Sequence, residues 1–172
     1  MASSLVWHAA RAGVTRPSCF LKNPLCEVTV NVRAFSTMSP EDLRDVRALF
    51  LRQAAAETAH DIEVMDSILA RPPAGQPDPV NFVARAYTFW GREAVLDHFR
   101  AVFAGTWQFE PDEDAMRVIP LGPDTAHLYA PTRITAGAAG QPAATFQFLV
   151  NEIAIRTADG WRISAIVPVP TK

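Results

Sequence analysis

Two long apolar stretches end the chain, and a turn signal separates them. Residues 143–157 and 161–169 are rich in Val, Ile, Phe and Thr, the composition of β-strands. Between them stands Asp159-Gly160, a dipeptide that favours a two-residue hairpin turn. The pattern predicts a long antiparallel hairpin, and counting back from the turn pairs Glu152 with a residue near Val167. Strands of this length suit the spine of a bent antiparallel sheet that the earlier segments cover.

Apolar residues with a helical period fill the segment that follows a short N-terminal extension. Ser39 can cap a helix of residues 40–59, because a proline suits its first turn and acidic residues follow. Asp61 is predicted to cap a second, shorter helix, which ends before Arg71-Pro72-Pro73. Residues 92–104 carry the pattern of a third helix, with its apolar residues on one face.

Alternating patterns predict the remaining strands. Residues 80–89 alternate as one strand before the third helix, and residues 106–110, 115–121 and 125–135 alternate after it. Most helical segments therefore precede most strands. This order predicts an α+β layer architecture and not a series of βαβ units.

The N-terminal residues 1–38 differ in charge from the domain predicted for residues 39–172. They carry a net charge of +3, whereas the rest of the chain carries −5, and they contain both cysteines. Three interpretations are open: a disordered arm, translated upstream sequence before a true start at Met38, or a mitochondrial presequence. The first two predict a cytoplasmic protein, and the third predicts the mitochondrial matrix.

Composition excludes several classes of function. The 172 residues suit one domain plus a tail, and a net charge of −2 without a basic patch gives no sign of nucleic-acid binding. No apolar run reaches the ~20 residues that span a membrane. The four histidines are scattered and no glycine-rich phosphate loop is present, so neither a metal nor a cofactor is predicted.

Four short segments stand out by their order and spacing: Ala59-His60-Asp61, Trp90-Gly91-Arg92-Glu93-Ala94-Val95, Leu121-Gly122-Pro123-Asp124-Thr125-Ala126 and Asp159-Gly160-Trp161-Arg162-Ile163. In this order they resemble the nuclear transport factor 2-like superfamily, in particular its SnoaL-like branch. The resemblance covers about residues 39–172. It implies a cone in which a strongly curved antiparallel sheet wraps around three N-terminal helices and leaves a pocket at the open end. Many members are dimers, so the resemblance also implies a homodimer.

Members of this superfamily include ketosteroid isomerases, polyketide cyclases, dehydratases, epoxide hydrolases and non-catalytic binding proteins. The fold alone therefore does not select a function. Its proton-transfer enzymes place a carboxylate inside the apolar cone, where burial raises the pKa. Glu152 is the predicted acid/base, because it follows Phe146, Phe148 and Val150 on one strand face. An exposed strand end, or a pair with an arginine, is the alternative for Glu152.

Further side chains are candidates for contacts to a ligand. His127, Tyr129 and Arg133 share one face of their strand; His127 is predicted as a catalytic donor, and the other two as contacts to a bound carbonyl or carboxylate. An outer or dimer face is the alternative for all three. Tyr87 and Trp90 are predicted to line the pocket near the opening of the cone, and a role in the core or in a dimer is the alternative.

Three functions are consistent with the sequence. The first is a pocket protein of undetermined chemistry that binds a small apolar or carbonyl-containing ligand. The second is a cofactor-independent cyclase, isomerase or dehydratase that uses a buried carboxylate as acid/base. The third is a non-catalytic dimerisation module. Compared with the ketosteroid isomerase pattern that the resemblance brings in, the first helix contains no tyrosine and the first strand contains no acidic residue, which disfavours isomerase activity in particular.

Overall fold

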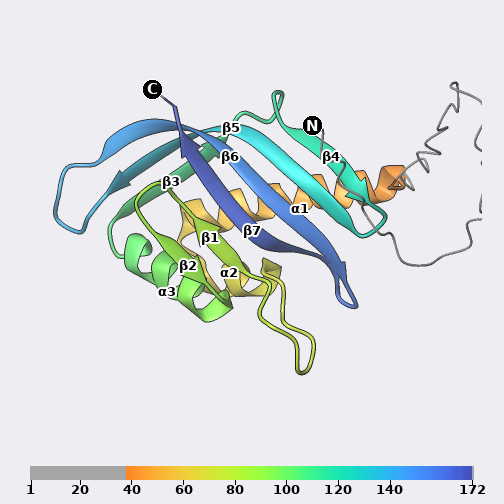
Figure 1. Cartoon of the computed structure of the whole chain (residues 1–172). Coiled ribbons are helices and arrows are strands. Elements are labelled where there is room, and N and C mark those ends of the chain that lie inside the picture. Colours follow the sequence, from red (N-terminus) through yellow and green to blue (C-terminus); the bar gives the residue numbers. More distant parts are fainter. Residues whose placement is uncertain (1–37, 172) are drawn as a thin grey trace, which may run out of the picture. The chain divides into compact units, whose positions relative to one another are not determined.

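The structure, a computed structural model, describes residues 38–171. In these residues three helices and seven strands follow one another (Figure 1). The helices are α1 (Pro40–Ala59), α2 (Ile62–Ile68) and α3 (Arg92–Phe103). The strands are β1 (Asn81–Val83), β2 (Thr88–Trp90), β3 (Thr106–Pro111), β4 (Arg117–Gly122), β5 (Thr125–Gly137), β6 (Ala144–Thr157) and β7 (Gly160–Pro170). The extension predicted for residues 1–38 lies outside the described residues, except for Met38, which is buried.

One curved sheet contains all seven strands. The order is β2-β1-β7-β6-β5-β3. Strand β4 also pairs with β5, next to β3 and along a different part of the same edge of β5. The long strands β5, β6 and β7 are antiparallel neighbours and arch over α1 (Figure 1). The predicted α+β cone, with a curved sheet around three helices, is therefore confirmed.

Local capping fixes where the helices begin. Ser39 forms a capping box with Asp42: the Ser39 hydroxyl accepts from the backbone N–H of Asp42 at 3.1 Å, and the Asp42 carboxylate accepts from that of Ser39. Asp61 caps α2 by accepting from the backbone N–H of Val64 at 2.9 Å. Both predicted caps are confirmed. The residue before α3 is Gly91, which has no side chain that could cap the helix. The carboxylate of Asp78 takes this role and accepts from the backbone N–H of Arg92 at 2.7 Å.

The strand predicted for residues 80–89 is wrong in one respect, because the structure folds this segment into the hairpin β1–β2. The chain reverses at Arg85 and Ala86, where the backbone N–H of Ala84 donates to the carbonyl of Tyr87 at 3.0 Å. The two arms continue one alternating pattern, so the pattern alone does not reveal the turn. Strand β1 also pairs in parallel with β7, so the sheet is mixed and not purely antiparallel.

The C-terminal hairpin is confirmed, but its register differs from the predicted one. Glu152 lies opposite Ile166 and not Val167. The two loop residues are Ala158 and Asp159, one position earlier than predicted, and Gly160 opens β7 with a φ of 96°. A bulge next to Ala154 then shifts the pairing by one residue.

The apolar core fills the space between the concave face of the sheet and the helices. Phe50 of α1, Phe99 of α3, Leu128 of β5 and Ile163 of β7 are fully buried there. Alternate residues of each long strand point into this core, as a strand with one covered face requires. Within residues 38–171, every helix is too short or too polar to cross a membrane.

Candidate functional site

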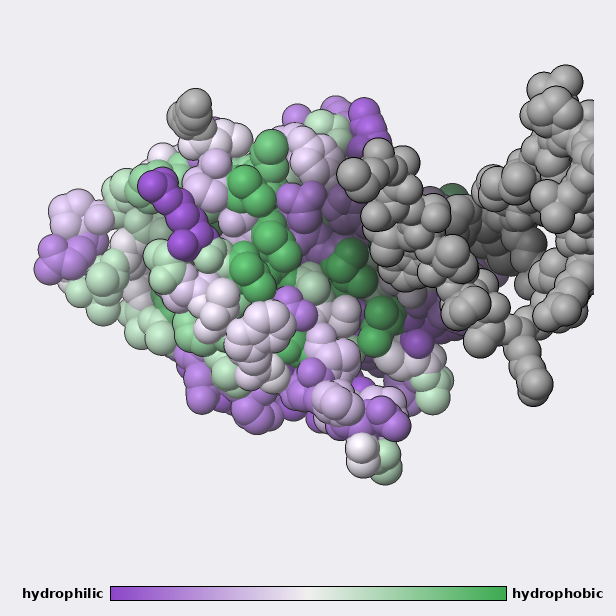
Figure 2. Space-filling model, viewed as in Figure 1, coloured by the Kyte–Doolittle hydropathy of each residue, from purple (hydrophilic) through white to green (hydrophobic). Residues whose placement is uncertain are grey.

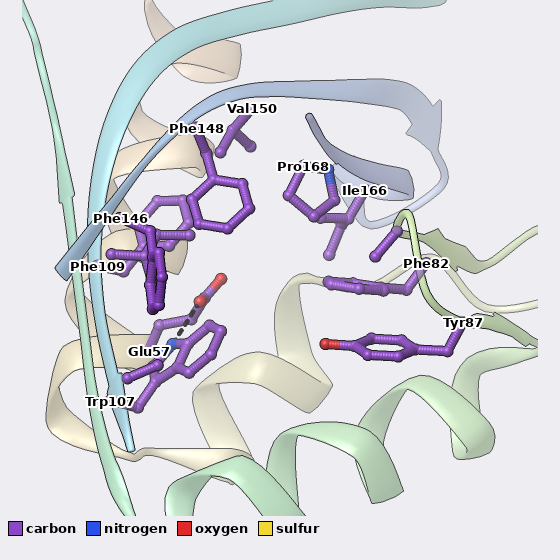
Figure 3. Close-up of a pocket in the computed structure, with 13 residues that line it drawn as sticks. Glu57, Phe82, Tyr87, Trp107, Phe109, Phe146, Phe148, Val150, Ile166 and Pro168 are labelled. Atoms are coloured by element: carbon purple, nitrogen blue, oxygen red, sulfur yellow. Dashed lines mark hydrogen bonds between the residues drawn. The ribbon is translucent and has the colours of Figure 1, made fainter. Parts of the chain in front are cut away.

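A cavity of about 220 Å³ opens between α1, the hairpin β1–β2 and the concave face of the sheet. Most of its lining is apolar (Figure 3). The volume lies below the range typical of pockets for drug-sized ligands, so the cavity suits a small molecule. The lining residues are Glu57, Phe82, Ala84, Tyr87, Trp107, Phe109, Ile134, Ala136, Phe146, Phe148, Val150, Ile166 and Pro168.

Glu57 is the acidic residue that lines this cavity. It lies near the C-terminal end of α1 and is only 1% exposed. Its Oε1 accepts a hydrogen bond from Nε2 of Gln53, one helical turn earlier, at 2.8 Å. Its Oε2 accepts from the indole Nε1 of Trp107 on β3, also at 2.8 Å (Figure 3). Two donors from different elements therefore hold the carboxyl group in one orientation.

Burial changes the acidity of Glu57. Loss of contact with water penalises the charged carboxylate and raises the pKa from its usual 4.5 to about 7. The hydrogen bonds from Gln53 and Trp107 stabilise the charged form and limit this rise. A carboxyl group with a pKa near 7 exists in both protonation states at neutral pH, which is the condition for efficient proton transfer in either direction.

Glu152 lies on the concave face of β6 and is 1% exposed, so the structure places it inside the core. It is not among the cavity-lining residues. Neither of its carboxyl oxygens has a hydrogen-bond partner within residues 38–171. Burial raises its pKa well above 4.5, and the nearby charge of Glu57 raises it further, while Gln53 has a smaller opposite effect.

Tyr87 brings a second polar group to the cavity. Its ring lies 6.4 Å from that of Phe82 at an interplanar angle of 14°, and the residue is 49% exposed. The hydroxyl group points into the cavity, toward the side occupied by Trp107 and Glu57 (Figure 3). Tyr87 therefore borders both the cavity and solvent.

The other candidates from the sequence lie away from Glu152. His127 and Tyr129 alternate with buried residues of β5 and so belong to the outer face of the sheet. His127 Nε2 lies 3.1 Å from Oδ1 of Asn151 on the neighbouring strand. Arg133 forms two 3.0 Å hydrogen bonds with the Glu110 carboxylate. Trp90, 69% exposed, is not among the cavity-lining residues.

Sequence reasoning missed Glu57 and its donors Gln53 and Trp107. The signal for the two helical residues was present, because Phe50, Gln53, Ala54 and Glu57 follow the i, i+3, i+4, i+7 spacing of one helix face. Polar residues in that apolar stripe must be buried, and buried polar groups need partners. The contact to Trp107 had no comparable signal, since it joins residues fifty positions apart.

A wider depression of about 860 Å³ lies between the end of α2 and the turn that joins β6 to β7. Two of its arginines are already paired: Arg71 with Asp66 at 2.9 Å, and Arg156 with Asp42 and Asp124. It contains no buried acid with a raised pKa. Glu57 and its cavity are therefore the better candidate site.

The chain belongs to the SnoaL-like domain family, whose sequence profile matches residues 46–167. The resemblance seen in the sequence is thereby confirmed. No curated protein matches the chain.

Solved structures confirm the nuclear transport factor 2-like fold. A candidate dehydratase of that family from Streptomyces avermitilis is 21% identical, with a TM-score of 0.65 over 77% of this chain and 99% of that one. A candidate aromatic ring hydroxylase from Novosphingobium aromaticivorans is 17% identical, with a TM-score of 0.68 over 79% and 93%. A ketosteroid isomerase-like protein from Erwinia carotovora atroseptica is 14% identical, with a TM-score of 0.63 over 78% and 99%. At these identities the likeness extends to the fold and not to the chemistry.

Proposed function

We propose that this protein is an acid–base enzyme of the isomerase, cyclase or dehydratase type, acting on a small apolar carbonyl compound without a cofactor. The observation that carries the proposal is the carboxyl group of Glu57, held at the wall of an apolar cavity with a pKa of about 7. The apolar lining supports an apolar substrate, and the volume supports a small one.

In the proposed reaction, ionised Glu57 removes a proton from the carbon next to the substrate carbonyl. The C–H electron pair moves into the new enolate, and negative charge develops on the carbonyl oxygen. The proton on Glu57 then returns to a different carbon, which completes an isomerisation, or goes to a departing hydroxyl group, which completes a dehydration. Each carboxylate oxygen of Glu57 accepts one hydrogen bond from the protein, so each keeps a lone pair for the substrate.

The surrounding side chains have separate roles in this proposal. Trp107 and Gln53 orient the Glu57 carboxylate and limit the rise in its pKa. The hydroxyl of Tyr87 points into the same cavity and can donate to the developing enolate oxygen. The apolar residues exclude water, which strengthens these electrostatic contacts.

Deuterium exchange tests the proposal directly. The purified chain is incubated in deuterated buffer with small cyclic ketones such as cyclohexanone and 1-indanone, and exchange at the α-carbon is followed by NMR. We expect saturable acceleration that rises with pH through about 7, as Glu57 ionises. Glu57→Gln should lower the rate on the order of 10²-fold or more, the usual contribution of a general base.

Glu63→Gln is the matched control, because Glu63 is an exposed acid on α2 and its replacement should leave the rate unchanged. Ligand binding is measured in parallel by calorimetry. Binding that is unaffected by Glu57→Gln, with no exchange above the buffer rate, would refute the catalytic role and leave a pocket protein that only binds.

The homodimer predicted from the sequence stays a prediction. Figure 2 shows apolar side chains gathered in a band on one face of the molecule, over the β6 and β7 region. Ala165, Val167 and Val169 alternate with buried residues of β7 and so point outward, and Val169 is exposed. Sedimentation equilibrium of wild type and Val167→Lys would test whether this face joins two copies.

A further inference from the structure

Three buried side-chain oxygen atoms on α1 and β6 have no hydrogen-bond partner within residues 38–171. They are Oε1 of Gln53 and both carboxyl oxygens of Glu152. Gln53 and Glu152 are almost completely inaccessible to water, so solvent does not supply the missing bonds. Gln53 acts on both acids: its Nε2 donates to Glu57, and its amide has a small lowering effect on the pKa of Glu152, against the larger effect of burial.

The position of one proton decides whether these atoms are satisfied. If both acids were ionised, two negative charges would be buried close together, and one of them would accept no hydrogen bond. If Glu152 carries a proton, its hydroxyl becomes a donor, and Oε1 of Gln53 is a buried acceptor that has no partner. The amide of Gln53 then accepts from Glu152 and donates to Glu57 at the same time.

Moving that proton to Glu57 is less favourable. The Gln53 amide would have to reverse, so that its oxygen faced Glu57 and its nitrogen faced Glu152. Trp107 would still point its indole N–H at Oε2 of Glu57, since an indole nitrogen is only a donor. Trp107 therefore favours the ionised form on Glu57 and the neutral form on Glu152.

We propose that Glu152 is a positioning residue that stays protonated at neutral pH and donates a hydrogen bond to Gln53, so that Gln53 in turn holds the Glu57 carboxylate. When Glu57 is ionised, the Gln53 amide then connects a neutral acid to a charged one. The role of Glu152 in orienting a catalytic base rests on the function proposed for Glu57. The protonation of Glu152 does not, and it can be measured without any substrate.

Within residues 38–171, no cation acts on the pKa of Glu152 to oppose this arrangement. Its register partners are Leu128 on β5 and Ile166 on β7, both apolar and buried. Among the described residues, Glu57 of α1 is the charged group whose field acts on it. An ionised Glu152 would therefore have a like charge nearby and no counterion.

Difference infrared spectroscopy of the full chain tests the proposal. A protonated carboxyl group gives a C=O stretching band that disappears on ionisation. We expect wild type to keep one such band well above pH 7, after Glu57 has ionised, and Glu152→Gln to lose it. Wild type without a Glu152-dependent band at pH 7 would overturn the proposal. Glu63→Gln is the control, because Glu63 is an exposed acid on α2 and its replacement should leave the band in place.

The midpoint of the Glu57 band provides a second, independent readout. A glutamine at position 152 is neutral and can donate an N–H to Gln53, so Glu152→Gln should leave the Glu57 midpoint unchanged. Glu152→Met removes the donor, frees the Gln53 amide and should move the midpoint upward. A lower Glu57 midpoint in Glu152→Gln than in wild type would show that the substitution had removed a negative charge from position 152, and would refute the proposal. If Glu152→Met does not fold, the glutamine variant alone decides.

Absence of ketone exchange in every variant would contradict the proposed enzyme activity but not this proton assignment. Conversely, an active enzyme whose Glu152 is ionised at neutral pH would contradict the assignment alone. The two proposals therefore fail separately.

Discussion

Replacing Glu57 with Gln should change how the stability of this protein depends on pH. In the folded state Glu57 holds its proton up to a pKa of about 7, whereas in the unfolded chain it releases the proton near 4.5. The folded state therefore binds more protons between these two values. The contribution of Glu57 to stability is greatest below pH 4.5, falls as the pH rises through this window, and levels off above about 7.

The size of the effect follows from the two pKa values. The difference between 4.5 and about 7, at about 1.4 kcal/mol per pH unit, corresponds to a loss of about 3 kcal/mol on the alkaline side. Glutamine is neutral at every pH and removes this loss. It also leaves one of the donors, Gln53 or Trp107, facing an amide N–H group, which costs about 1–3 kcal/mol. That cost does not depend on pH, so it shifts the curve without changing its slope.

Urea unfolding at a series of pH values measures this prediction. The difference in free energy of unfolding between Glu57→Gln and wild type should rise by about 3 kcal/mol from pH 4.5 to pH 8, in favour of the variant. Other titrating groups act in both proteins and largely cancel in the difference. Parallel curves for the two proteins would refute the argument that burial controls the acidity of Glu57, and Glu63→Gln should give such parallel curves.

Three further substitutions test separate parts of the structure. Trp107→Phe removes a hydrogen bond that stabilises ionised Glu57, so the pKa of Glu57 should rise and the pH profile of ketone exchange should move to higher pH. Burial lowers the pKa of His98, so its charging destabilises the fold as the pH falls below 6.5; His98→Phe should flatten acid unfolding curves in that range. Asp78→Ala removes the side-chain cap of α3 and should lower the free energy of unfolding by about 1–2 kcal/mol, measured by urea titration; unchanged stability would show that Asp78 is not the effective cap of Arg92.

Local chemistry made much of the fold predictable. Ser39 and Asp61 cap their helices through side-chain contacts three residues away, so the residues that decide each helix start are adjacent in sequence. The C-terminal hairpin likewise follows from a turn signal between two β-rich segments. The register was less secure, because the turn falls one position earlier than predicted and a bulge next to Ala154 then moves the partner of Glu152 by a residue.

The candidate site was only partly predictable. Glu152 was recognised as an acid in an apolar strand, and the structure does bury it. Glu57 was overlooked, although its place in the apolar stripe of α1 marked it as buried. Its chemical character depends on Trp107, which reaches it from another element, and on a cavity whose walls come from many separate segments.

The sequence by itself determined the helices, most strands, the α+β class and the family, because each depends on short-range periodicity, capping and turn residues. Tertiary structure alone decided which acid faces the cavity, which face of β5 points outward, and that β1 joins β7 in parallel. Those outcomes depend on contacts between residues far apart in the chain. A pKa near 7 at Glu57 is likewise a property of the assembled core, since it arises from the water that the folded protein excludes.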